Sequence, residues 1–143
     1  MNIKQALKLK NKLIANIKSC YNIIQTQNSV EKGNPRRYSV TEKIDEAQKY
    51  ITDLVELKRH IHQANAPMYE KIFLMAELKG LVKQLKNMSV TEGKQSGGYR
   101  TVSEELEVEI NIAERDRLVA GLEETIEKLQ DELDVFNATT DIA

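Results

Sequence analysis

The chain has 143 residues, of which 41% are apolar and 30% charged, and its formal net charge is −1. This length suits about one domain, and the aliphatic content is too high for a disordered chain. With no Trp, 2 Phe, 2 Pro and 6 Gly, the composition favours long helices over a β-sandwich or barrel. We therefore expect a mainly α fold in a single domain over residues 1–143. It would have four long helices, in an elongated antiparallel bundle or in helical hairpins, and a short β-strand or hairpin before the last helix.

The near-neutral total hides a gradient of charge along the chain. Residues 1–40 have 8 Lys or Arg and 1 acid (+7), residues 41–100 have 10 and 8 (+2), and residues 101–143 have 3 and 13 (−10). A basic end can bind nucleic acid, or the two ends can pair with each other. We favour pairing, because a nucleic-acid arm has no need of a matching acidic end.

The first predicted helix covers about residues 3–29, because apolar residues recur there at alternating steps of four and three. Gly33 and Pro35 would end it. Ala6, Leu13 and Cys20 widen its apolar stripe. The predicted seam is Ile3, Leu7, Lys10, Ile14, Ile17, Tyr21 and Ile24.

The second predicted helix, about residues 40–65, starts at a capping box of Ser39 and Glu42. The break at Asn65–Pro67 is short, which favours an antiparallel hairpin with a third helix over about 68–88. The predicted buried residues are Ile44, Ala47, Ile51, Leu54, Leu57 and Ile61 in the second helix, and Met68, Ile72, Met75, Leu78, Val82 and Leu85 in the third. Because the third helix also contains Phe73, Leu74 and Leu81, it should be the most buried helix, or use these residues at a subunit interface.

A flexible loop is predicted over residues 89–105, where Gly93, Gly97 and Gly98 gather and Tyr99 is the one ring. Strict alternation from Leu106 to Ile112 then predicts a short strand over about 106–111. A lone strand is unstable, so it should pair with residues 97–102 or with the same strand of a second subunit.

The last predicted helix, about residues 112–137, begins after an N-cap at Asn111 and has the most regular heptad of the chain. Only Arg115 interrupts its apolar positions. Two interpretations stay open, a coiled-coil contact between subunits and an ordinary amphipathic bundle helix, and they differ in the number of partners. The candidate interface residues are Ile112, Val119, Leu122, Ile126, Leu129, Leu133 and Phe136.

No motif indicates catalysis, so we expect no enzyme, no catalytic residues, no cofactor and no metal. Cys20, the one cysteine, falls on the apolar side of its helix and is interpreted as a core residue. His60 and His62 point to different sides of a helix and cannot share a metal. On a strand, Glu105, Glu107 and Glu109 would share one face, which we interpret as solvated or as paired with basic residues of a partner.

We expect a self-associating helical protein, a dimer or larger. The alternative is a nucleic-acid-binding or phage-type accessory protein, whose contacts would come from Lys8, Lys12, Arg36 and Arg37. A single cysteine suits a reducing compartment, and the N-terminal stretch lacks the apolar core of a signal peptide, so we expect a cytoplasmic protein with no membrane contact.

Two stretches near the end of the chain carry a resemblance to a known family. They are Glu105–Ile112, which leads into a helix, and Leu133–Ile142; Ile61–Asn65 stands where that family has an Ile/Asn-rich turn. The chain resembles a small bacterial helical family called septicolysin-like, although Ala138 replaces the usual Trp of its N-W-x-T-like ending. The resemblance implies an all-helical fold with a small strand element and no established activity. The lytic name implies nothing for this chain, because no apolar helix in it could cross a bilayer.

Overall fold

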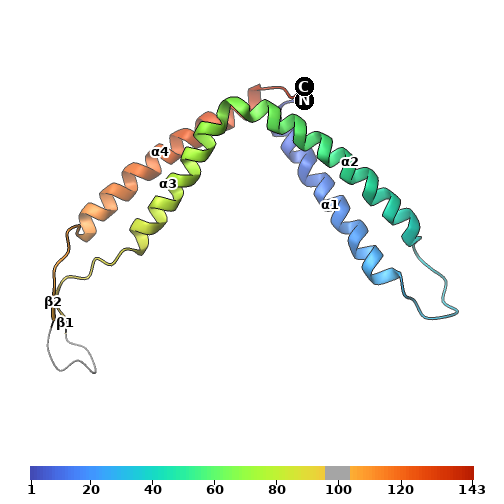
Figure 1. Ribbon diagram of the computed structural model, residues 1–143, viewed down its shortest axis with the longest axis horizontal. Coiled ribbons are helices and arrows are strands. Elements are labelled where there is room, and N and C mark those ends of the chain that lie inside the picture. Colours follow the sequence, from blue (N-terminus) through green and yellow to red (C-terminus); the bar gives the residue numbers. More distant parts are fainter. Residues whose placement is uncertain (96–103) are drawn as a thin grey trace. The chain divides into compact units, whose positions relative to one another are not determined.

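The computed structural model describes residues 1–95 and 104–143 (Figure 1). The described residues are mainly helical, which confirms the predicted class. They divide into a first unit, Met1–Met68 with Asp134–Ala143, and a second unit, Tyr69–Leu133. The helices are α1 (Ile3–Gln27), α2 (Val40–Asn65), the 3-10 helix η1 (Ala66–Met68), α3 (Tyr69–Asn87) and α4 (Ile112–Thr139), and the strands are β1 (Gly93–Gln95) and β2 (Glu104–Leu106).

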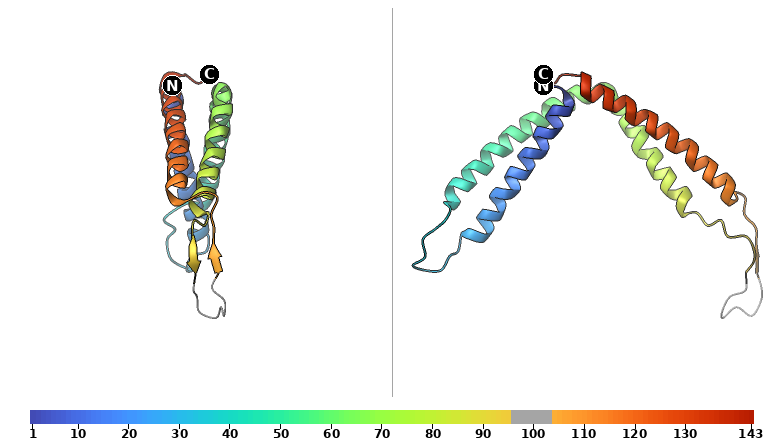
Figure 2. Two further views of the ribbon diagram at one scale, coloured as in Figure 1. Left: turned by 90° about the vertical axis from the view of Figure 1, so that its left-hand side faces the viewer. Right: turned by 180° about the vertical axis from the view of Figure 1, so that it is seen from behind.

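The first unit is built on α1 and α2, which run side by side in opposite directions (Figures 1 and 2). Ala6 and Leu13 of α1 pack against Leu57 and Ile61 of α2, and Ile142 from the chain end covers part of this cluster. Both helices bury residues at alternating steps of three and four, the spacing of an antiparallel coiled-coil pair. The buried residues of the two helices are Ile3, Ala6, Leu13, Ile17, Cys20, Ala47, Leu57 and Ile61.

The predicted seam of α1 is correct at Ile3 and Ile17, which are buried, and wrong at Tyr21. Ala6, Leu13 and Cys20, which were expected only to widen the stripe, are buried, whereas Tyr21 of the predicted seam is 46% exposed. On α2, Ile44 and Ile51 were expected to be buried and are 42% and 38% exposed. In both helices, contact with the other helix selects which of the adjacent apolar columns becomes the core.

The predicted loop between the second and third helices does not form. The chain passes from α2 through η1 into α3 without leaving helical conformation, and the described residues therefore hold three uninterrupted helical stretches rather than four separate helices. Pro67 lies inside η1 and just before α3. Proline is tolerated at such a position because the amide hydrogen it lacks would have no partner in the first turn of a helix.

The helix ends are closed by side chains. Ser39 accepts a hydrogen bond from the amide of Glu42 at 3.2 Å, and Asn111 accepts one from the amide of Glu114 at 2.9 Å, as predicted. Asn2 forms a full capping box with Gln5 at the start of α1, with distances of 2.8 and 3.0 Å. These contacts satisfy amide groups that have no partner inside the helix.

The two ends of the chain meet in the first unit (Figure 1). The amide of Ile3 donates to the carbonyl oxygen of Thr140 at 2.9 Å, and the amide of Ile142 donates to that of Met1 at 3.0 Å. The side-chain amide of Asn2 adds a bond of 3.1 Å to the carbonyl oxygen of Ala138. We call this set of bonds the terminal clasp. It holds the start of α1 against the end of α4.

In the second unit, α3 and α4 run side by side in opposite directions (Figure 2). Met75 and Val82 are buried on α3 and Val119 on α4, so the predicted stripes of the two helices face each other. Ion pairs join Lys71 to Glu132, and Lys86 to Glu123 at 2.9 Å. The expectation that the third helix is the most buried is wrong, because Phe73 is 63% exposed and Leu74 and Leu81 are 46% exposed.

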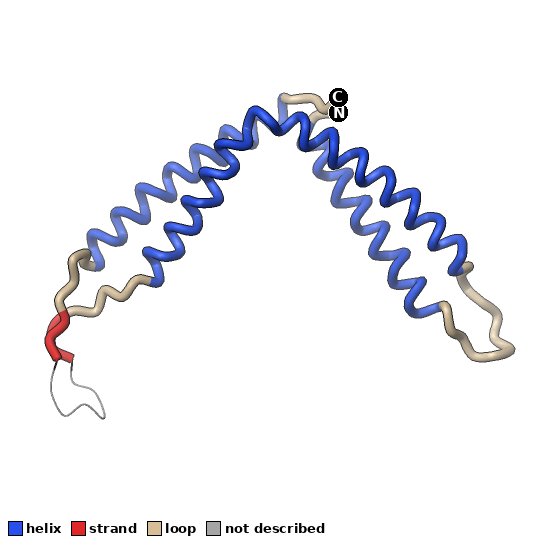
Figure 3. Tube along the Cα trace, viewed as in Figure 1, coloured by secondary structure: helices blue, strands red, loops and turns tan. Residues whose placement is uncertain are grey.

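A two-stranded antiparallel hairpin closes the far end of the second unit (Figure 3). Gly93 pairs with Leu106, and Gln95 with Glu104, which is the local pairing that was one of the two predicted options. The predicted strand over 106–111 is wrong except at Leu106, because β1 offers only three partner residues and the following chain bends towards the cap of α4. Of the predicted flexible loop, residues 96–103 lie outside the described residues, and so does the predicted partner segment 97–102.

Candidate interaction surfaces

The candidate interface residues of α4 differ in how far they are buried. Val119 is buried and Ile112 is exposed, while Leu122, Ile126 and Leu129 are half-buried. Leu133 and Phe136 are half-buried as well. A single neighbouring helix therefore leaves most of this stripe partly accessible. Its use between subunits stays a prediction.

The first unit has one apolar flank and one polar flank beside its core. Ile44 and Ile51, seven residues apart on α2, lie on one flank, and Glu46 and Asp53 lie on the other.

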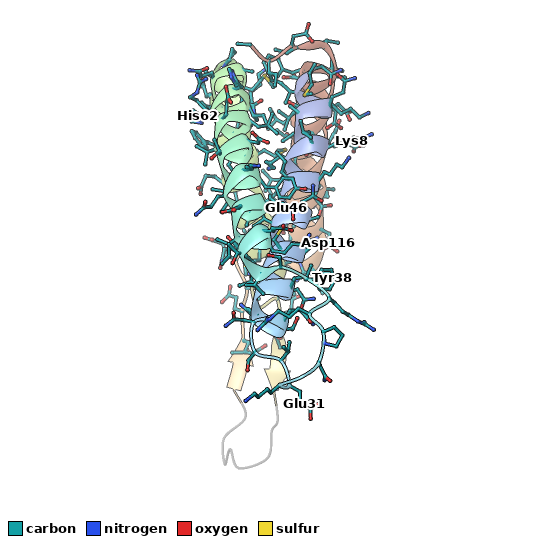
Figure 4. The ribbon with its side chains drawn as sticks, turned by 90° about the vertical axis from the view of Figure 1, so that its right-hand side faces the viewer. Lys8, Glu31, Tyr38, Glu46, His62 and Asp116 are labelled. Carbon is teal, nitrogen blue, oxygen red and sulfur yellow. The ribbon has the colours of Figure 1, made fainter. Side chains whose placement is uncertain are left out.

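Glu46, which is labelled in Figure 4, forms an ion pair within α2. Its carboxylate accepts a hydrogen bond from Lys43 at 2.8 Å. That hydrogen bond is the main reason why the pKa of Lys43 is raised above its ordinary value, and Cys20 and Tyr50 contribute less.

The basic residues predicted for nucleic-acid contact differ in their surroundings. The guanidinium of Arg36 donates to the carbonyl oxygens of Gln27 and Asn28 at 2.8 and 3.0 Å, so it closes the end of α1. These two bonds use two of the five N–H groups of the guanidinium, so the assignment of Arg36 as a nucleic-acid contact stays a prediction. Lys8 is exposed on the side of α1 turned away from α2 (Figure 4). Lys12 and Arg37 are exposed as well.

A shallow polar hollow lies where the start of α1 meets the end of α4. It is lined by Lys4, Leu7, Lys8 and Asn11 of α1 and by Asp134 and Asn137 of α4. The side-chain oxygen of Asn137 is buried there without a hydrogen-bond partner. Periodicity along the chain could not predict this hollow, because the residues that line it come from opposite ends of the chain.

The remaining candidate residues are the cysteine, the histidines and the acidic run. Cys20 is buried, as predicted for a core residue. His60 lies 3.2 Å from a guanidinium nitrogen of Arg59, and its Nδ1 is buried without a partner. In the residues that the structure describes, no three His, Cys, Asp or Glu side chains gather as metal ligands. Glu105 lies in β2, but the strand ends before Glu107, so the predicted acidic strand face does not form.

Comparison of the chain with protein-family models, curated proteins and solved structures gives no match. The septicolysin-like family therefore stays a proposal that rests on the short motifs described above. Within residues 1–95 and 104–143, no helix has both the length and the apolar character needed to cross a membrane.

Proposed function

We propose that this protein is a non-enzymatic helical interaction protein that associates with copies of itself. The observation that carries the proposal is the number of large apolar side chains left open to solvent in both units. They include Tyr21, Ile44, Ile51, Val55, Phe73, Leu74, Leu81 and Leu118, all at least 38% exposed.

The physical reason is that each unit is built on one layer of two helices. A helix in such a layer has one neighbour and covers only one side of its apolar surface, whereas stable domains pack at least two layers around a core. Large contiguous apolar patches on soluble proteins commonly mark interaction sites. A second copy would supply the missing layer.

Charge supports the same proposal. α1 has five Lys and no acid, while α4 has eight acids and three basic residues. Exposed ion pairs each contribute only about 0–1 kcal/mol, so such complementarity sets pairing and register more than stability. The heptad spacing of α1, α2 and α4 fits coiled-coil packing. We also propose that the protein is cytoplasmic and belongs to the septicolysin-like family.

The test is the mass of the full chain in solution, measured by light scattering coupled to gel filtration at micromolar concentration. We expect at least twice the chain mass of 16.3 kDa at both low and high salt. A monomer under both conditions would refute self-association.

A second candidate function is binding of nucleic acid through α1. It is favoured by Lys4, Lys8, Lys12 and Lys18, which are all exposed on one acid-free helix. Such binding should weaken steeply as salt rises, because phosphate contacts release counterions. A mobility-shift assay at low salt with duplex and single-stranded DNA and RNA tests it, and unretarded probes would exclude it.

A further inference from the structure

We propose that two charged columns bind each other between copies of the chain, with the basic column of α1 in one copy against the acidic column of α4 in another. This inference rests on the proposed self-association and names the residues that pair. The basic column is Lys4, Lys8 and Lys12, and the acidic column is Glu123, Glu127 and Asp131.

The basic column consists of side chains four residues apart, which places them on one side of α1 at intervals of about 6 Å. All three are exposed, and Lys8 points away from α2 (Figure 4). Among the described residues, none of the three has a hydrogen bond or an ion pair. Lys4 and Lys8 line the hollow that also contains Asp134, and Lys12 lies outside it. Because α1 has no acid, nothing within the helix offsets the repulsion between these like charges.

The acidic column repeats the same spacing on α4, and its three side chains are exposed. Glu123 already forms an ion pair with α3 at 2.9 Å, whereas Glu127 and Asp131 have no hydrogen bond or ion pair among the described residues. Lys128, which follows Glu127 in the chain, pairs with Glu124 at 3.3 Å. Two successive turns of α4 therefore present acids that no base of the helix offsets.

The two columns match in spacing and are opposite in sign, so they can pair side chain by side chain over about 12 Å of helix. Like charges across a contact disfavour it, so α1 against α1 and α4 against α4 are both disfavoured. Contact between α1 of one copy and α4 of another offsets the repulsion in both columns. In a symmetric dimer this contact occurs twice, because each copy supplies one column of each kind.

The second copy is favoured over a nucleic acid as the occupant of the basic column. Phosphates would also suit these lysines. The acidic column, however, calls for a basic partner, and α1 of the same sequence is one. A contact between two copies accounts for both columns at once, whereas a nucleic acid accounts for one of them.

The first test reverses the charge of each column in the full-length chain. Lys8→Glu with Lys12→Glu, and separately Glu127→Lys with Asp131→Lys, should each raise the dissociation constant of self-association about tenfold or more in about 0.05 M NaCl. Light scattering over a series of concentrations measures this constant, and circular dichroism at 222 nm checks that the helices are unchanged. Lys8→Gln with Lys12→Gln, which removes the charges without reversing them, serves if a reversed chain folds poorly, and should raise the constant about threefold.

The matched control for the lysine variant is Lys49→Glu with Lys58→Glu. It changes the net charge by the same amount at two exposed lysines of α2. Since these lysines lie outside the basic column, the dissociation constant should change by less than about threefold. An effect as large as that of Lys8→Glu with Lys12→Glu would show that net charge, and not the column, governs self-association.

The second test mixes the two reversed variants. Each variant alone sets like charges against each other in both contacts of a dimer, whereas a mixed dimer has one basic and one acidic column at each contact. We therefore expect the equimolar mixture to form mixed dimers with a dissociation constant within about threefold of the wild-type value. A mixture that stays monomeric would overturn the contact between the columns.

The outcomes separate this inference from the proposed function. A wild-type chain that is monomeric refutes both. A wild-type oligomer that both reversed variants leave intact overturns the paired columns while self-association stands. If Lys8→Glu with Lys12→Glu keeps the oligomer but abolishes a mobility shift of duplex DNA, the basic column is a nucleic-acid contact instead.

Discussion

Arg36 closes α1 from outside the helix: its Nη1 donates to the carbonyl oxygen of Gln27 at 2.8 Å and its Nη2 to that of Asn28. Carbonyl groups in the last turn of a helix have no partner inside it, and a cation there also opposes the negative end of the helix dipole. The loop between α1 and α2 is thereby tied to the end of α1.

Replacing Arg36 should therefore affect folding. We expect Arg36→Gln to lower the free energy of unfolding by about 1 kcal/mol, the usual contribution of such exposed bonds, in a urea titration. Arg37→Gln is the matched control, since Arg37 is exposed and lacks this role, and should change stability by less than about 0.5 kcal/mol. Equal effects of the two substitutions would show that Arg36 does not cap α1.

Asn2 links the start of α1 to the end of α4. Its side-chain oxygen caps α1 through Gln5, and its side-chain nitrogen bonds the carbonyl oxygen of Ala138. Asn2→Ala should cost about 1–2 kcal/mol of unfolding free energy, because it removes a helix cap and leaves a carbonyl oxygen without its partner. Asn22→Ala, on the exposed side of α1, should cost less than about 0.5 kcal/mol.

Met75 and Leu74 are adjacent residues of similar size with opposite surroundings, 8% and 46% exposed. Met75→Ala should lower the free energy of unfolding by about 2–3 kcal/mol, since it removes buried methylene groups and leaves a cavity. Leu74→Ala should lower it by less than about 1 kcal/mol. A Leu74→Ala cost as large as that of Met75→Ala would show that Leu74 is covered in solution, and the second unit would then have a partner of its own.

The ion pair between Lys86 and Glu123 crosses from α3 to α4 at 2.9 Å with both side chains about half exposed. A double-mutant cycle of Lys86→Met and Glu123→Gln should give a coupling of about 0.2–1 kcal/mol that falls as NaCl rises from 0.05 to about 0.5 M. A coupling that ignored salt would mean that the pair is shielded from solvent.

Cys20 is a built-in probe of the first unit, because its thiol is 4% exposed beside α2. Maleimide labelling of the native chain should be at least 100-fold slower than labelling in urea, since the reagent must wait for an opening of the α1–α2 pair. Fast native labelling would show that the pair opens readily.

Heptad spacing predicted the helices and most of their limits from the sequence, but not which side of α1 is buried. Ala6, Leu13 and Cys20 form one apolar column, and Leu7, Ile14 and Tyr21 form the next. Both repeat every seven residues, so periodicity alone cannot rank them. The choice depends on α2, whose buried Ala47, Leu57 and Ile61 meet the first column. In the second column Tyr21 is 46% exposed, whereas Leu7 and Ile14 are half-buried.

Contacts between residues that are far apart in the sequence could not be predicted either. The alternative function assigns Arg36 and Arg37 to phosphate contact, and nothing local indicates that the guanidinium of Arg36 reaches back to Gln27. Pro67 was interpreted as the start of a loop, although a proline beside a helix start is equally compatible with a continuing helix. In both cases the residue type is compatible with two structures, and the sequence alone does not select between them.

The terminal clasp has a consequence for the order in which the chain folds. Asn2 and Ala138 bond across a separation of 136 residues, whereas α1 and α2 are joined by a loop of about a dozen. The entropy lost on closing a chain segment rises with its length, so the two helix pairs should form before the clasp. The amides of Ile3 and Ile142 would then be the last to gain protection from hydrogen exchange during refolding, and the first to lose it when the native chain opens locally.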